Sequence, residues 1–169
     1  VQREHVLRAL VALARHSLNR CTVLQLPCGA WSKVKFGKDG GPEPIFTVDH
    51  PDGVPGDACA RGIALAMERV RAGVSIGSAT LTAGNQLVSE HPAEEGLRSV
   101  LCSRGLEQHS GMHSTAPFKA LVSAHGLRSV LTDLACSGHQ HKKVTEYLVS
   151  PALFPAFQAV FGVLRVPDG

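Results

Sequence analysis

Apolar residues recur at helical spacing at the start of the chain and again near its middle. Residues 3–18 place apolar side chains at the i, i+3, i+4, i+7 positions of one helical face: Leu7, Leu10, Val11, Ala14 and Leu18. A second amphipathic helix is predicted over residues 57–73, with Asp57 as its N-cap and Gly73 at its C-terminal end.

Short alternating or β-branched runs predict strands between and after these helices. Residues 21–28 predict a strand that Pro27 ends, because proline cannot donate to a β-ladder. Residues 31–36 and 45–48 flank the turn sequence GKDGGP and predict a β-hairpin. Residues 74–88 predict one or two short strands, and residues 144–149 (VTEYLV) predict another.

Two further segments return to a helical pattern. Residues 93–102 follow Pro92 and place acidic residues in the first turn, where they favour a helix. Near the C-terminus, Phe154, Phe157, Val160 and Phe161 form an apolar stripe. This stripe either packs on the core or, over residues 154–163, presents a docking surface for another protein.

The order of these elements predicts an α+β fold in a single domain that spans residues 1–169. We expect a mainly antiparallel sheet of about four to six strands with about three or four helices. Within it, residues 1–90 form a helix, hairpin, helix and strand half, and residues 91–169 form a helix-rich half that carries a histidine and cysteine cluster.

Composition and charge suggest a subunit that works with partners. Charged residues make up 18% of the chain, below the ~25% typical of soluble domains, which suggests that partners cover part of the surface. The net charge of +3 is a mild basic excess. Five cysteines without a regular spacing argue against a secreted disulfide scaffold and favour a reducing, intracellular compartment.

Small groups of basic residues are candidate contacts for RNA phosphate. They are Lys33, Lys35, Arg69, Arg71, Lys142 and Lys143. The alternative is that each group belongs to a solvated face. For Lys33 and Lys35, a further alternative is that lysine on a strand discourages edge-to-edge pairing.

The segment 102–141 concentrates potential metal ligands. His109 and His113 are four residues apart, and Cys136 and His139 form a short C-x-x-H pair, so these four side chains could bind zinc tetrahedrally. Gly111 disfavours a helix between the two histidines. The alternatives are a structural segment with surface histidines, or a hydrolase in which a cysteine of the segment is the nucleophile and a histidine the base.

Several familiar catalytic and membrane signals are missing from the sequence. There is no GxGxxG, P-loop or HExxH pattern. No run of 18 apolar residues occurs, so no membrane span is predicted. Because the chain begins at Val1 rather than Met, the lack of a targeting signal carries no information.

These observations favour a non-catalytic binding subunit of a larger assembly, a ribonucleoprotein among the options. Such a subunit would contact RNA phosphate and neighbouring proteins and would need no cofactor. The alternative is a zinc-stabilised module or a cysteine/histidine-dependent hydrolase that uses the 102–141 cluster. No catalytic residue is assigned, and no membrane partner is expected.

Overall fold

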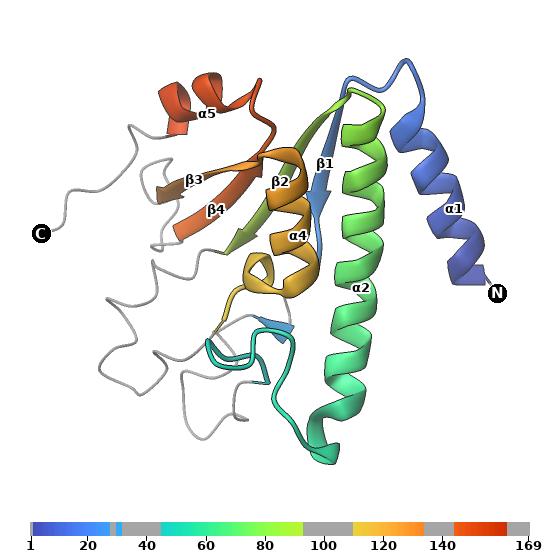
Figure 1. The fold of residues 1–169 in the computed structure, drawn as a ribbon, viewed down its shortest axis with the longest axis vertical. Coiled ribbons are helices and arrows are strands. Elements are labelled where there is room, and N and C mark those ends of the chain that lie inside the picture. The colour runs from blue at the N-terminus through green and yellow to red at the C-terminus, as the bar shows by residue number, and fades with distance from the viewer. Residues whose placement is uncertain (1, 28–29, 32–44, 93–109, 134–143, 162–169) are drawn as a thin grey trace, which may run out of the picture.

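A mixed β-sheet of four strands lies at the centre of the computed structural model, with helices on both of its faces (Figure 1). The structure describes residues 2–27, 30–31, 45–92, 110–133 and 144–161. Its elements are α1 (Gln2–Arg15), β1 (Cys21–Gln25), α2 (Asp57–Thr82), β2 (Gln86–Pro92), the 3₁₀ helix η5 (Met112–Ser114), α4 (Ala116–His125), β3 (Arg128–Asp133), β4 (Val144–Val149) and α5 (Phe154–Phe161). The predicted α+β class is confirmed.

The strands lie in the order β1-β2-β4-β3. β1 and β2 are parallel, with Cys21 opposite Gln86, and α2 is the crossover that a parallel pair requires. β4 is antiparallel to both β2 and β3. The sheet is therefore only partly antiparallel, because one long helix joins its first two strands.

The length of α2 corrects the sequence prediction. Gly73 does not end the helix, and residues 74–82, predicted as strand, continue it to Thr82. The two glycines permit a close approach to the sheet. A Cβ at Gly73 would lie 2.5 Å from Leu26 Cδ1, and one at Gly77 would lie 3.1 Å from Leu87 Cδ2. Close packing on the sheet outweighs the low helix propensity of glycine here.

The returning strand predicted at residues 45–48 is also wrong. These residues form bends around a single bridge position at Thr47. Phe46 is fully buried there and stacks on Trp31, with ring centroids 4.6 Å apart. The apolar residues of this stretch therefore contribute to the core without forming a strand. Residues 32–36, the other arm of the predicted hairpin, lie outside the described residues.

Several predictions are confirmed. The N-terminal helix, the strand that begins at Cys21, the strand over 144–149 and the helix that begins at Phe154 are all present. Gly126 adopts a left-handed conformation (φ 65°) and caps α4, so the chain turns directly into β3. The helix predicted over residues 93–102 falls outside the described residues.

The two faces of the sheet carry cores of different size. α2 and α4 cover one face, where the main core gathers side chains from both helices and from β1, β2 and β4. α5 packs on the other face, against Val88, Val130 and Val149. The phenylalanines predicted to pack or to dock, Phe154, Phe157 and Phe161, are half-buried on this small core, while Val160 is 60% exposed.

Candidate functional site

Most residues of the predicted sites fall outside the described part of the chain. His109, Cys136 and His139 of the zinc set lie there, as do Lys33, Lys35, Lys142 and Lys143 of the phosphate set. Only His113, Arg69 and Arg71 are described. Within the described residues, no three histidine, cysteine, aspartate or glutamate side chains come together as a metal site.

His113 lies in η5, at the junction between the sheet and α4. Gly111 before it is extended, as expected from its low helix propensity, and the Thr115 hydroxyl donates to the Met112 carbonyl at 2.8 Å. The Asp52 carboxylate accepts a hydrogen bond from the Ala116 N–H at 2.9 Å, which anchors the first turn of α4. These two hydrogen bonds hold the end of η5 and the start of α4 in place.

The imidazole of His113 is buried and engaged through both ring nitrogens. Its Nε2 lies 3.0 Å from Ser89 Oγ on β2, and its Nδ1 lies 2.9 Å from Glu146 Oε2 on β4. Because a carboxylate only accepts, Nδ1 carries the proton, and a neutral ring then presents Nε2 as an acceptor for the Ser89 hydroxyl. The Phe118 ring meets the imidazole edge-on at a centroid distance of 5.0 Å.

Glu146 is held as a carboxylate by donors on both of its oxygens. Burial disfavours the charged form, but the hydrogen bonds from His113 and Ser129 and the electrostatic interactions with His113 and His91 together outweigh it. The net effect lowers the pKa of Glu146. The Ser129 hydroxyl donates to Oε1 at 2.6 Å, and the carboxylate side chain is 23% exposed.

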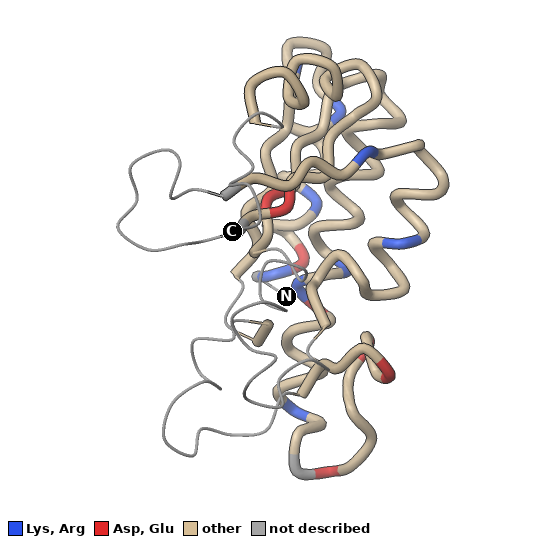
Figure 2. Tube along the Cα trace, turned by 90° about the vertical axis from the view of Figure 1, so that its left-hand side faces the viewer, with Lys and Arg blue, Asp and Glu red and all other residues tan. Residues whose placement is uncertain are grey.

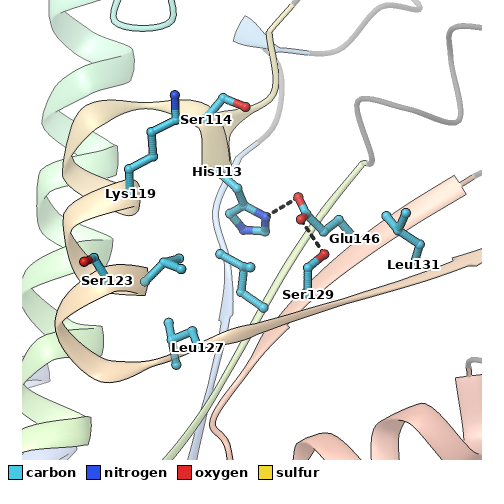
Figure 3. A pocket seen from close by; sticks show the side chains of 10 residues that line it. His113, Ser114, Lys119, Ser123, Leu127, Ser129, Leu131 and Glu146 are labelled. Carbon is cyan, nitrogen blue, oxygen red and sulfur yellow. Dashed lines mark hydrogen bonds and ion pairs between the residues drawn. The ribbon is translucent and has the colours of Figure 1, made fainter.

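Glu146 lines a pocket of about 520 Å³ between α4 and the strands β3 and β4 (Figure 3). Figure 3 shows Glu146 and Ser129 on the sheet side, with Lys119 and Ser123 on the α4 side. Apolar side chains complete the lining: Val122, Leu127, Leu131 and Leu148. The pocket therefore combines an ionised carboxylate, a lysine and hydroxyls with an aliphatic surface.

Ser89, His113 and Glu146 are connected in the order of a serine–histidine–acid triad. A nucleophile must also reach its substrate, and Ser89 fails this condition. It is fully buried in the strand β2 and does not line the pocket. The hydrogen bonds thus fix His113 and Glu146, and the arrangement lacks the exposed serine that acyl transfer requires.

Glu146 and Ser89 were missed from the sequence, although Glu146 carries a signal. In VTEYLV, residues 144, 146 and 148 share one side of the strand because side chains alternate. Leu148 is buried, so an acidic side chain on the same face predicts a partnered, half-buried carboxylate. Ser89 gives no comparable signal, because a buried serine is common in any strand.

The described basic residues do not gather into one surface. Figure 2 shows them scattered along the chain trace, and by sequence they lie in α1, α2, α4 and β3 and, for Arg20, just before β1. Arg69 and Arg71 are both exposed on α2, but residues two apart lie on different sides of a helix. Arg71 lines a separate pocket with Asp52 and the start of α4. No helix in the described ranges is long and apolar enough to cross a membrane.

Comparisons with family models, with curated proteins and with solved structures give no match to this chain. The geometry of its own residues therefore carries the argument about function.

Proposed function

We propose that this chain is a non-catalytic binding domain that holds a small amphipathic ligand in the pocket beside Glu146. The observation that carries the proposal is an ionised carboxylate, fixed by His113 and Ser129, in the wall of a pocket of about 520 Å³. Small-molecule sites are typically concave, largely apolar and equipped with a few fixed polar groups.

Binding is favoured over acid–base catalysis by the state of the same residues. Both nitrogens of His113 have protein partners, so neither is left to take a proton from a ligand. The lowered pKa of Glu146 makes it a weaker base than an ordinary glutamate. The pocket is therefore better suited to orient a ligand than to deprotonate it.

The lining defines what the ligand must offer. Each Glu146 oxygen accepts one hydrogen bond from the protein, and a carboxylate has further lone pairs, so a ligand N–H or O–H can donate to it. Lys119 has no ion pair among the described residues and can receive an anionic group. The aliphatic lining suits a short hydrocarbon body between the two ends.

The test is a titration of the labelled protein with three sets of small probes: aliphatic amines, aliphatic amino acids and alkyl phosphates. Amide resonances of Ser123, Ser129 and Leu131 are expected to shift with at least one set. Ser123→Phe, which fills the pocket from α4, should abolish the shifts. Ala124→Phe, at the neighbouring exposed position outside the lining, should preserve them. Shifts that survive Ser123→Phe, or none with any set, would refute the proposal.

A wider role as a subunit that contacts RNA is the second candidate. The exposed guanidinium groups of Arg69 and Arg71 support it, although their different directions on α2 suit two separate phosphate contacts better than one patch.

The zinc-stabilised module is supported by the His113–Glu146 pair, because a zinc-bound histidine usually donates the N–H of its other ring nitrogen to a carboxylate. In that case Nε2 must exchange Ser89 for the ion.

A further inference from the structure

β1 is the last strand on one side of the described sheet. The Gln86 N–H donates to the Arg20 carbonyl at 3.0 Å, and parallel pairing alternates along a strand. The backbone N–H and C=O groups of Cys21, Val23 and Gln25 therefore face away from β2. No other described strand pairs with these groups, so they form a row of donors and acceptors that another strand can pair with.

The usual protections of an edge strand are missing from β1. The strand reads CTVLQ and has no charged residue and no proline, and its register with β2 is continuous. Natural edge strands are commonly protected by lysine, proline or a bulge, because an unprotected edge recruits other strands. An unprotected edge is therefore expected to be covered in the functional molecule.

An apolar groove runs beside this edge. α1 packs along α2, on the side of the sheet where β1 is the last strand (Figure 1). Between α1 and β1 lies a groove of about 650 Å³, which Ile76 of α2 also lines. Leu10 and Leu13 of α1 are 43% and 63% exposed, and Val23 is 62% exposed. The groove offers apolar contacts to the side chains of an added strand.

We propose that a second copy of this chain pairs its β1 antiparallel to this β1 across a two-fold axis, which joins the two sheets. With Val23 opposite Val23 of the second copy, Cys21 pairs with Gln25 on either side, and every outward backbone group of β1 gains a partner. Two-fold dimers are the commonest closed assemblies of identical chains.

The charges around β1 are compatible with this occupant. In the proposed register, Arg20 of one copy lies beside Leu26 of the other, so the two arginines that flank the strands do not face each other. β1 itself adds no charge to the junction. The ligand pocket lies at β3 and β4, two strands away from β1, so dimerisation does not depend on the proposed ligand.

Light scattering after size-exclusion chromatography of the full chain, from roughly 1 to 100 µM, tests the proposal. The wild type should have the mass of two chains. Val23→Lys places two ammonium groups opposite each other at the two-fold axis and should raise the dissociation constant about 100-fold. Val160→Lys, at a similarly exposed valine on α5, should leave the dimer intact.

Amide hydrogen exchange of the wild type provides a measurement that needs no variant. The N–H groups of Val23 and Gln25 should exchange more slowly as concentration rises, because pairing removes them from water. A monomeric wild type at 100 µM would overturn the proposal and leave the edge to a strand of another protein. A Val23→Lys chain that folds and stays dimeric, or fast exchange at Val23 in a dimer, would also overturn it.

Discussion

Replacement of Glu146 by glutamine tests whether an ionised carboxylate organises the pocket. The amide is nearly isosteric and can retain both contacts as neutral hydrogen bonds, because a serine hydroxyl can accept as well as donate. What the variant loses is the charge on two hydrogen bonds, from His113 and Ser129. A hydrogen bond to a charged group contributes about 1.5–3 kcal/mol, and a neutral one about 0.5–1.5 kcal/mol. We therefore expect Glu146→Gln to lower the free energy of unfolding by about 2 kcal/mol at pH 7.

The effect should depend on pH in one direction. Because folding lowers the pKa of Glu146, its stabilisation is fully present above the unfolded-state pKa, near ~4.3. It is lost as the pH falls through the lower pKa of the folded state. Glutamine does not titrate, so the difference between wild type and Glu146→Gln should shrink towards zero in acid.

Urea unfolding at several pH values, followed by tryptophan fluorescence, measures this difference. Trp31 is the only tryptophan in the chain and is buried against Phe46, so its emission reports loss of the core. Glu68→Gln is the control, because its contact with Arg3 is exposed and should change stability by less than about 0.5 kcal/mol. A difference for Glu146→Gln below about 0.5 kcal/mol at pH 7, or one that persists unchanged at pH 3, would contradict the reasoning.

Three other predictions address the helix α2 and the two alternative functions. A Cβ at Gly77 would lie 3.1 Å from the buried Leu87, so Gly77→Ala should lower the melting temperature. Gly62→Ala should raise it, because a Cβ there would make only an ordinary van der Waals contact, 3.6 Å from Ile45. The same sign for both would refute the close-approach argument. If the zinc alternative holds, emission spectrometry of protein purified without chelator should find about one zinc per chain, lost in Cys136→Ala. Less than about half an equivalent contradicts it. If Arg71 contacts phosphate, RNA retention on filters should weaken with salt, and Arg71→Ala should reduce the salt slope by about 1; retention that is independent of salt argues against RNA contact.

Local sequence patterns predicted the elements whose own residues show a clear period, and they failed where packing against other elements determines the secondary structure. α1, β1, β4 and α5 each carry a period that fits one kind of element, and each was predicted correctly. Residues 74–82 contain β-branched residues, which favour a strand, and Gly77, which disfavours a helix interior. The sheet reverses this preference, because the glycines allow α2 to pack on Leu26 and Leu87.

The pocket shows why a functional site is harder to predict than an element. Its polar side chains come from η5, α4, β3 and β4, and they meet only because β4 inserts between β2 and β3. If β3 instead of β4 lay next to β2, a strand would separate Ser89 on β2 from Glu146 on β4, and His113 could not contact both. The spacing of the histidines identified His113 as a candidate site residue, but it predicted partners from the same 102–141 segment. The described partners of His113 are Ser89 and Glu146, which lie on the adjacent strands β2 and β4. The one local sign of the site was an acidic residue on the buried side of a predicted strand, and such a residue indicates a partner without identifying it.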